Sequence, residues 1–471
     1  MDFWGPYNDT MFSEALRSFA PEKLRSLWWG GGYSPADPFP NHTKYMVLGT
    51  ANASAYYITL GPGSLTAFGG DCLPTVGLQK HMPLLNRFRF GLGDLLNNTP
   101  MAKPEILVYW SHASQAASIL DERLTNPRDG TGTMIPFFYR HALPFEYVSE
   151  RTIDRLKMPS VKVLFLCGAT SLSAKEVNAI QTFIRNGGVV IADRNPGVFN
   201  EYLREMKAPL FGNLFDNIPY AKLKQPKMMD NLQVKSSRGN VLASSKALVT
   251  PGSKFWVERR AGKGRTVTAN FNFAVVDASS KGKNSFDAFL KKELLAYGVK
   301  FPARVTGCMK KTVIRIREAT DHKIYAISVN ESDAGRKLTF SIPEKAFIYD
   351  VYTGKMVNGK NFSWQDAASS EWVFGVFAEK QAAPSIKVDA AVTRGQSLTI
   401  DLSGNSASRV IGLLFTGPDG KKMYVRNMVA ILANGKKVEF RTAFNDKPGK
   451  YTVRALDHST GLSTVKTFIV K

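Results

Sequence analysis

The pattern of hydrophobic and polar positions is that of a βα array over residues 1–100. Short apolar runs alternate there with helical segments, and aromatic residues and glycines stand where the runs end. The runs are DFWGPYND, SLWWGGGY and SAYYITLGPG, and the helical segments between them are SEALRSFAPEKLRS and HTKYMVLGTANA. Strands that alternate with helices are typical of parallel βα units. We therefore predict the C-terminal part of a (β/α)8 barrel-like domain in residues 1–100, with its functional face at the strand ends.

The next segment, residues 101–228, also predicts strands alternating with helices. VKVLFLCG is a continuous apolar run, as expected for a strand that is covered on both faces. Ser173 and Glu176 have the spacing of a capping box that starts a helix. Val177, Ile180 and Phe183 then follow at helical spacing, and VVIAD predicts the next strand. The pattern favours a flavodoxin-like doubly wound domain over residues 101–228.

Beyond residue 228, short alternating segments predict an all-β architecture. Over residues 229–380, such segments surround one helical stretch, SFDAFLKKELLAYGV, and predict a β-sandwich with one helix. EKQAAPS reads as a linker. Residues 384–471 repeat the all-β pattern, which predicts a second, immunoglobulin-like (Ig-like) β-sandwich. The fold class expected for the whole chain is therefore multidomain, α/β followed by all-β.

The charge of the chain is strongly positive but unevenly spread. Of the 471 residues, 62 are Lys or Arg and 39 are Asp or Glu, which gives +23. Residues 1–150 hold 11 basic and 13 acidic residues, and residues 151–471 hold 51 and 26. Such an excess is compatible with nucleic acid, an anionic polymer or an acidic surface as a partner. The basic residues are scattered and form no stripe interleaved with aromatics, so a solvated basic surface is favoured over these partners. No run of about 18 apolar residues is present, so we expect no membrane span.

The residues that could bind a metal or a cofactor form no recognised pattern. The three cysteines lie far apart, and the six histidines show no HxxxH spacing, so neither a disulfide framework nor a metal site is predicted. No GxGxxG opens a helix, so no cofactor is predicted. Cys167 ends an apolar run before a helix, which is how some enzymes present a nucleophile. No motif places a histidine or an acid beside it, and a buried thiol that packs as a small hydrophobe is favoured.

The order of these parts resembles that of the β-galactosidases of glycoside hydrolase family 42. The resemblance covers residues 1–380 loosely and 104–200 best, and YDVYTGK (Tyr349–Lys355) also fits it. The middle stretch is similar to the trimerisation domain of those enzymes, a relative of class I glutamine amidotransferases. The matching residues are Leu172, Ser173, Glu176, Ile180, Phe183, Ile184, Gly187, Gly188, Val190, Ile191 and Asp193. This resemblance implies carbohydrate metabolism, an oligosaccharide or polysaccharide partner and a homotrimer.

The same resemblance implies two catalytic glutamates at barrel strand ends, one acting as acid/base and one as nucleophile. The strand that would carry the nucleophile is SLWWGGGY, and it has no glutamate. The nearest carboxylates do not fit that position; they are Asp2, Asp9, Glu22 and Asp37. The catalytic residues therefore remain unknown, and we do not expect the chain as written to be a complete β-galactosidase.

Aromatic residues at the predicted strand ends are the candidate substrate-binding residues. They are Trp4, Tyr7, Trp28, Trp29 and Tyr33. Their rings could stack on sugar faces, and the alternative is ordinary packing inside the barrel.

Two classes of function stay open. One is a carbohydrate-active protein resembling the C-terminal part of a β-galactosidase-like hydrolase, with its enzyme status undecided. The other is a non-catalytic, extracytoplasmic glycan-binding or assembly protein. No signal peptide is visible in the first residues. Barrel strands encoded upstream of Met1 would favour the first class, and a true start at Met1 would favour the second.

Overall fold

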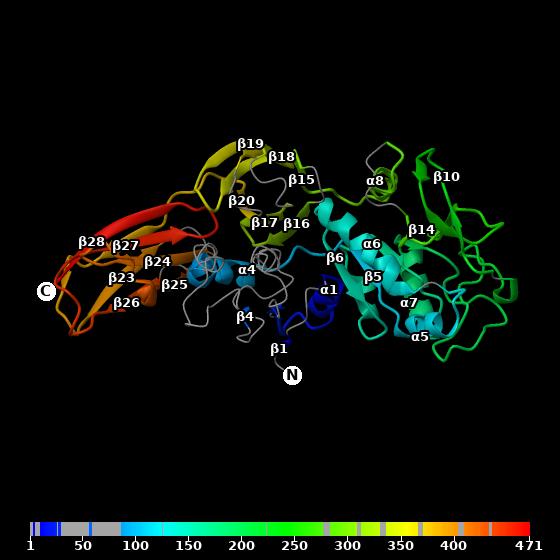
Figure 1. Cartoon of the computed structure of the whole chain (residues 1–471), viewed down its shortest axis with the longest axis horizontal. Helices are drawn as coiled ribbons and strands as arrows, with labels where there is room; N and C mark the ends of the chain where they lie inside the picture. The colour runs from blue at the N-terminus through cyan, green and yellow to red at the C-terminus, as the bar shows by residue number, and fades with distance from the viewer. Residues whose placement is uncertain are drawn as a thin grey trace, which may run out of the picture. The chain divides into compact units, whose positions relative to one another are not determined.

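The structure is a computed structural model. It describes residues 3–4, 10–25, 27–29, 56–58, 86–124, 126–222, 224–276, 283–308, 312–329, 336–365, 371–403, 409–432 and 436–471, with the backbone alone for the strands before residue 60. The chain divides into two compact units (Figure 1). The first comprises residues 1–13, 22–102 and 303–471, and the second comprises residues 14–21 and 103–302. Each unit is described by itself below.

Short parallel strands lie near the N-terminus of the first unit. β1 (Phe3–Trp4) pairs in parallel with β2 (Leu24–Arg25), and helix α1 (Thr10–Phe19) lies between them in sequence. β3 (Leu27–Trp29) pairs in parallel with β4 (Tyr56–Ile58). The pairing of β3 with β4 agrees with the predicted parallel βα units. The stretch SEALRSFAPEKLRS, predicted as helical throughout, is instead a helix only to Phe19, because Pro21 disfavours helix before it, and Leu24–Arg25 form β2. The expected helix HTKYMVLGTANA falls outside the described residues.

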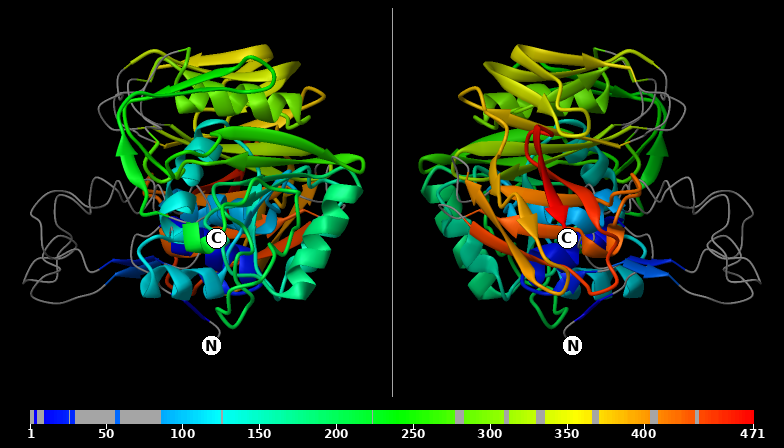
Figure 2. Two further views of the ribbon diagram at one scale, coloured as in Figure 1. Left: turned by 90° about the vertical axis from the view of Figure 1, so that its right-hand side faces the viewer. Right: turned by 90° about the vertical axis from the view of Figure 1, so that its left-hand side faces the viewer.

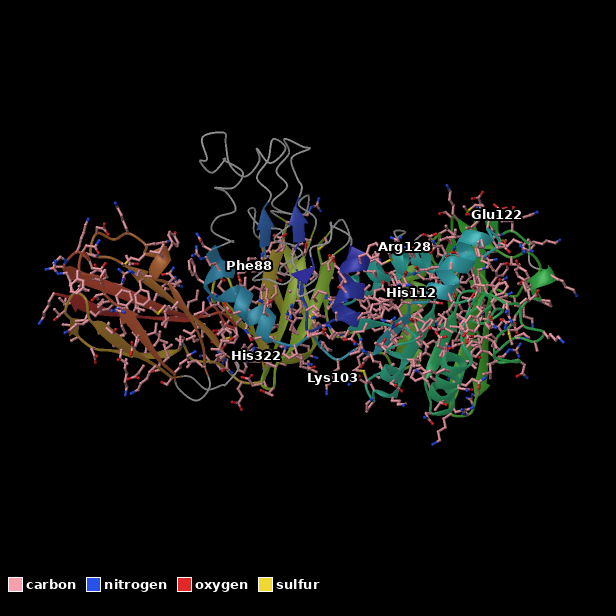
Figure 3. The ribbon with its side chains drawn as sticks, turned by 90° about the horizontal axis from the view of Figure 1, so that it is seen from below. Phe88, Lys103, His112, Glu122, Arg128 and His322 are labelled. Atoms are coloured by element: carbon pink, nitrogen blue, oxygen red, sulfur yellow. The ribbon has the colours of Figure 1, made fainter. Side chains whose placement is uncertain are left out.

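An antiparallel sheet forms the middle of the first unit. Its order is β15-β18-β20-β17-β16, and β19 pairs with β18 along both halves of that strand, on either side of a bulge between Ser341 and Ala346. The strands are β15 (Arg304–Thr306), β16 (Val313–Glu318), β17 (His322–Ser328), β18 (Leu338–Asp350), β19 (Met356–Trp364) and β20 (Glu371–Phe377). A π-helical turn η1 (Phe88–Leu92) and helix α4 (Gly93–Asn98) pack on this sheet through Phe88, Leu95 and Leu96 against Ile324 and Val373. Figure 3 labels Phe88 on this turn.

Two sheets build the C-terminal part of the first unit, the orange to red ribbons of Figure 2. One has the order β21-β23-β26 and the other β22-β28-β27-β24-β25. The strands are β21 (Ser385–Val388), β22 (Ala391–Val392), β23 (Ser397–Ser403), β24 (Val410–Thr416), β25 (Met428–Ile431), β26 (Lys436–Arg441), β27 (Gly449–Asp457) and β28 (Ser463–Val470). Alternate residues of β23 are buried, and both sheets share one apolar core. Below, these residues 385–471 are called the terminal sandwich.

The second unit is built on a six-stranded sheet of order β13-β14-β8-β7-β5-β6. The five strands from β14 to β6 run in parallel, and β13 is antiparallel to β14. The strands are β5 (Ile106–Tyr109), β6 (Phe145–Val148), β7 (Val163–Leu166), β8 (Val189–Ala192), β13 (Trp256–Ala261) and β14 (Gly264–Ala269). All four residues of β7 are buried, as the continuous apolar run predicts.

The hairpin β13–β14 differs from the sequence prediction, which assigned residues after 228 to a β-sandwich. β14 instead lies beside β8, with Thr266 opposite Val190. An alternating hairpin has the same pattern whether it starts a sandwich or extends an existing sheet, so its partner could not be identified from periodicity. Two small hairpins also belong to this unit: β9 (Lys227–Met229) with β12 (Ala247–Val249), and β10 (Leu232–Lys235) with β11 (Val241–Ser244).

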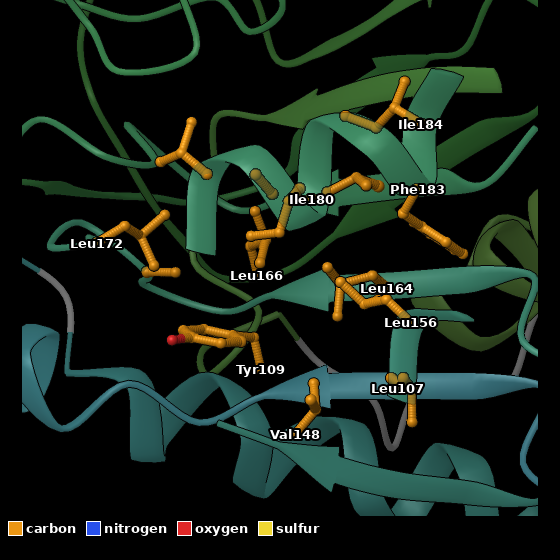
Figure 4. Packing of buried hydrophobic residues seen from close by; sticks show 14 of the residues in the cluster. Leu107, Tyr109, Val148, Leu156, Leu164, Leu166, Leu172, Ile180, Phe183 and Ile184 are labelled. Atoms are coloured by element: carbon orange, nitrogen blue, oxygen red, sulfur yellow. The ribbon is translucent and has the colours of Figure 1, made fainter. Parts of the chain in front are cut away.

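Helices cover both faces of this sheet. α7 (Ala174–Arg185) directs Ile180 and Phe183 at Leu164 and Leu166 of β7, as Figure 4 shows. Its predicted capping box is present: the Ser173 hydroxyl accepts the Glu176 amide, and the Glu176 carboxylate accepts the Ser173 amide. Four further helices of this unit are α5 (His112–Leu120), η2 (Ile153–Lys157), η3 (Tyr220–Lys222) and α8 (Phe286–Ala296).

Helix α6 (Pro127–Arg140) covers the opposite face and was not predicted from the sequence. Its Phe138 ring lies 4.9 Å from that of Phe145 and 5.7 Å from that of Phe165, measured between centroids. Two glycines and Pro136 lie inside the helix, and these residues have the poorest helix propensity. Its tertiary packing therefore overrides a weak local preference.

The edge strand β6 is covered by the second half of α1. The Arg17 guanidinium donates to the Phe145 carbonyl at 2.7 Å, and the Tyr147 amide donates to the Ser18 hydroxyl at 2.9 Å. These side chains satisfy backbone groups that an edge strand would otherwise leave unpaired. Among the described helices, none combines the length and apolar character needed to cross a membrane.

Candidate functional site

The candidate sugar-binding aromatics lie on the short parallel strands of the first unit. Trp4 ends β1 opposite Arg25, and Trp28 and Trp29 end β3 opposite Tyr57 and Ile58. These tryptophans thus lie at the carboxyl ends of parallel strands, the position that carries the site in barrel enzymes. Tyr7 and Tyr33 fall outside the described residues. The backbone is compatible with the predicted sugar site, which stays a prediction.

No catalytic carboxylate pair is found at these strand ends among the described residues. Of the acidic residues described before residue 100, Glu14 is fully buried on α1 and bonded to Arg17 and Tyr139. Glu22 is exposed in the turn before β2, at the amino end of that strand, and Asp94 lies on α4. Asp2, Asp9 and Asp37 are outside the described part of the chain. Glu22 therefore lies at the wrong end of its strand for catalysis.

The carboxyl edge of the parallel sheet in the second unit brings Cys167 and Asp193 together. Cys167 follows β7, Asp193 follows β8, and both are buried. A β-carbon on Gly130 of α6 would lie 3.1 Å from the Cys167 β-carbon and 3.3 Å from Asp193 Oδ2, so a larger residue would fit only if these neighbours moved by a few tenths of an ångström. The strand order reverses between β5 and β7, the place where such sheets usually bind ligands.

Burial controls the ionisation of both groups. It raises the pKa of the Cys167 thiol well above its ordinary value, and the nearby Asp193 raises it further. Burial also raises the pKa of Asp193 to about 7, although the Gly168 amide and the charge of Arg194 oppose this shift. The Gly168 amide donates to Asp193 Oδ1, while Oδ2 accepts no hydrogen bond from the described residues.

The residue after Asp193 holds a strained backbone. Arg194 has a φ of 135°, in the region that favours glycine, and its buried guanidinium donates to the Thr250 hydroxyl at 2.7 Å. Backbone strain of this kind is often found at functional sites. The guanidinium of an arginine is a poor nucleophile, so the residue held in this strained conformation does not itself offer one.

Serine hydroxyls occupy the point where the strand order reverses. The Ser111 hydroxyl caps α5 by accepting the Ser114 amide at 3.0 Å, and it donates to Ser114 Oγ at 2.8 Å. The Ser171 amide in turn donates to Ser114 Oγ at 2.9 Å. These hydrogen bonds tie the loop after β7 to the start of α5.

The histidines described by the structure do not activate Cys167. His112, labelled in Figure 3, begins α5 and packs edge-on against Trp110, with ring centroids 6.3 Å apart. His141 contacts Asp287 at 2.9 Å between Nε2 and Oδ1. His322 and His458 lie in the first unit, and His42 and His81 are outside the described residues. Cys167 is buried, as predicted, and its raised pKa disfavours the thiolate form that acts as a nucleophile.

No metal site is found in the described part of the chain, where no three His, Cys, Asp or Glu side chains gather closely enough to hold an ion.

Comparisons with known proteins identify the fold. No protein-family model matches the chain, and no curated protein matches its sequence. A catalytic mutant of a family 42 β-galactosidase from G. stearothermophilus has a TM-score of 0.56 at 12% identity, covering 80% of this chain and 59% of that one. The β-galactosidase from Bacillus circulans sp. alkalophilus gives 0.56 at 11% identity, covering 79% of this chain and 60% of that one. For the β-galactosidase from Rahnella sp. R3 the score is 0.52 at 10% identity, with the same coverages of 79% and 60%.

This chain therefore spans about 60% of the length of the enzymes that it resembles. At 10 to 12% identity the likeness concerns the fold alone. The resemblance that the sequence predicts is confirmed at that level: the fold of this chain is similar to that of the family 42 β-galactosidases.

Proposed function

We propose that the protein is a carbohydrate-active protein that binds an oligosaccharide or polysaccharide through the aromatic residues of its parallel strands. The observation that carries the proposal is the fold shared with β-galactosidases over 80% of the chain. Trp4, Trp28 and Trp29 lie at strand ends, and Tyr7 and Tyr33 would complete the aromatic cluster. Aromatic side chains combine a large apolar area with specific stacking geometry, which suits the faces of a sugar ring.

We also propose that the chain by itself does not hydrolyse glycosides. A retaining pair needs two carboxyl groups about 5–5.5 Å apart. The described strand ends offer no such pair, and SLWWGGGY has no glutamate. In this proposal the second unit is a flavodoxin-like, amidotransferase-related scaffold without chemistry of its own, because Arg194 occupies the strained turn after β8. The terminal sandwich would be an Ig-like module.

The test combines a binding and an activity measurement on the full chain. We expect a neutral β-galacto-oligosaccharide to bind, as followed by calorimetry, and Trp29→Ala to weaken the affinity roughly 2- to 10-fold through lost stacking. Tyr202→Ala, an exposed aromatic of the second unit, is the matched control and should bind normally. We expect no release of nitrophenol from a panel of aryl β-glycosides. Turnover that disappears when one carboxylate before residue 100 is replaced would contradict the non-catalytic proposal.

A homotrimer assembled through the second unit is proposed as well. Ile119 and Leu120, at the end of α5, are 81% and 78% exposed, which is unusual for two adjacent large aliphatic residues. Contact with another copy would remove this apolar surface from water. We expect sedimentation to show a trimer at micromolar concentration and Ile119→Asp to weaken it; a monomer would contradict the proposal.

We also propose that the protein acts outside the cytoplasm, where large glycans are encountered.

A further inference from the structure

A shallow pocket of about 490 Å³ lies at one end of the terminal sandwich. Three segments that are distant in sequence form it: the turn between β22 and β23, the end of η5 (Tyr424–Arg426) and the loop between β26 and β27. Its lining includes Gly395, Arg426, Arg441, Thr442, Phe444 and Asn445. All of these residues lie within the terminal sandwich, so among the described residues no other part of the chain lines the pocket.

The loop that carries Phe444 is held rigidly at both ends. The Thr442 hydroxyl donates to the carbonyls of Thr393 at 3.0 Å and Gln396 at 2.7 Å, which ties the loop to the β22–β23 turn. At the other end, the Asp446 carboxylate accepts the Ala443 amide at 2.7 Å. A loop that is fixed before binding loses little conformational entropy when a ligand arrives.

Phe444 stands at the tip of this loop and is 83% exposed. Its ring packs on Gly395, where an added β-carbon would lie 2.5 Å from the ring. Gly395 has a φ of 82°, which also favours glycine. A large aromatic ring is thus supported by backbone on one side and presented to solvent on the other. The exposed ring keeps a large apolar surface in contact with water, which is unfavourable. A ligand that stacks on the ring would remove this surface from water.

Two arginines give the pocket its positive charge, and only one of them has a guanidinium that the described residues leave free to bind a ligand. Arg426 donates to the Arg441 carbonyl and contacts the Asp446 carboxylate at 3.0 Å, so its guanidinium is engaged in holding the loops. The Arg441 guanidinium is exposed and has no hydrogen bond or ion pair with any described residue. The surrounding residues 384–471 contain 14 Lys and Arg against 6 Asp and Glu, a net charge of +8. A free guanidinium in a basic module favours a carboxylate ligand.

We propose that this pocket binds an acidic sugar, a pyranose ring bearing a carboxylate, within an anionic glycan. The ring would stack on Phe444, the carboxylate would pair with Arg441, and the Asn445 amide, also exposed, could bond a hydroxyl. The inference goes beyond the proposed function, because the pocket is separate from the aromatic strand ends and takes a charged sugar. It gives the excess of basic residues a specific partner.

The experiment titrates the full chain with a tetragalacturonide and with the neutral galactan tetramer, by calorimetry at low salt. We expect the acidic tetramer to bind, Phe444→Ala to weaken it roughly 2- to 10-fold, and Arg441→Gln roughly 10-fold. Val465→Ala and Lys466→Gln remove an exposed apolar residue and a charge from β28, in the other sheet, and serve as matched controls expected to bind as the wild type does.

Several outcomes would overturn the proposal: no binding of the acidic tetramer, equal affinity in all four variants, or equal weakening by Lys466→Gln and Arg441→Gln. Equally tight binding of a single-stranded DNA oligomer of the same charge, unaffected by Phe444→Ala, would also overturn it, because it would reduce the site to nonspecific attraction. The neutral tetramer tests the proposed function separately. If it fails to bind while the acidic tetramer still binds, the proposed function is contradicted and the acidic-sugar pocket is not.

Discussion

Replacing Arg17 with alanine is expected to lower the unfolding free energy of the second unit by about 3–5 kcal/mol. Arg17 and Glu14 are both buried, and Nε of Arg17 lies 2.7 Å from Oε2 of Glu14. Loss of the guanidinium leaves the Glu14 carboxylate buried without its cation and removes the donor to the Phe145 carbonyl. Removing one member of a buried ion pair is strongly destabilising, although replacing both members by apolar residues can leave the unfolding free energy nearly unchanged.

Hydrogen exchange of the β6 peptide is the measurement that isolates this effect. A chain of two units need not unfold in one step, so a single global midpoint would mix several transitions. Lys157→Ala is the control, because Lys157 and Asp154 form a pair of the same i,i+3 spacing, at 2.6 Å, but are 81% and 73% exposed. Exposed pairs contribute little, so we expect unchanged protection of β6. Similar protection in Arg17→Ala and Lys157→Ala would show that α1 does not secure the sheet edge.

The elements predicted correctly from the sequence are those whose signals are local. The capping box of α7 uses residues three positions apart, and β7 is an unbroken apolar run, so neither depends on distant partners. The parallel pairing of β3 with β4 also agrees with the predicted strand–helix–strand alternation. Each of these features can be recognised from a short window of sequence.

The features that were missed depend on partners far away in the chain. Helix α6 contains Pro136 and two glycines, and it exists because Phe138 packs on β6 and β7. Likewise, no sequence signal tied Ser18 to the amide of Tyr147, which is 129 positions away. Phe444 was missed as a candidate site residue, although an aromatic residue just before Asn-Asp in a predicted turn is a weak signal of an exposed ring. For the site, therefore, sequence supplied residue types but not their grouping.

Asp193 provides the second large effect, a stability that falls as the pH rises. Its pKa is raised from 3.8 to about 7 by burial. Between these two values the unfolded chain has released the proton while the folded protein still holds it, so the unfolding free energy decreases with rising pH. At about 1.36 kcal/mol per pKa unit, the total loss is about 4 kcal/mol by pH 8. Well below pH 3.8 the carboxyl is protonated in both states and carries no penalty.

Asp193→Asn is expected to abolish this part of the pH dependence. The amide keeps an oxygen to accept the Gly168 amide, and it cannot ionise beside Cys167. The variant should match the wild type near pH 4 and exceed it by about 4 kcal/mol at pH 8. Urea denaturation at a series of pH values, followed by exchange of the β8 peptide, measures the difference. The wild type and the variant share every other titrating group, including the buried Glu176. Subtracting one curve of unfolding free energy against pH from the other therefore isolates the contribution of Asp193.

The control for this experiment is Asp154→Asn. In the wild type the Asp154 carboxyl is exposed, and the hydrogen bond from Lys157 lowers its pKa. A lowered pKa acts with the opposite sign, since its stabilisation is lost as the pH falls, and solvent exposure keeps the effect small. A parallel pH dependence in Asp193→Asn and the wild type would mean that the carboxyl is ionised when buried. The charge of Arg194 would then outweigh burial, and the carboxyl edge of this sheet would hold an ion pair in place of a neutral acid.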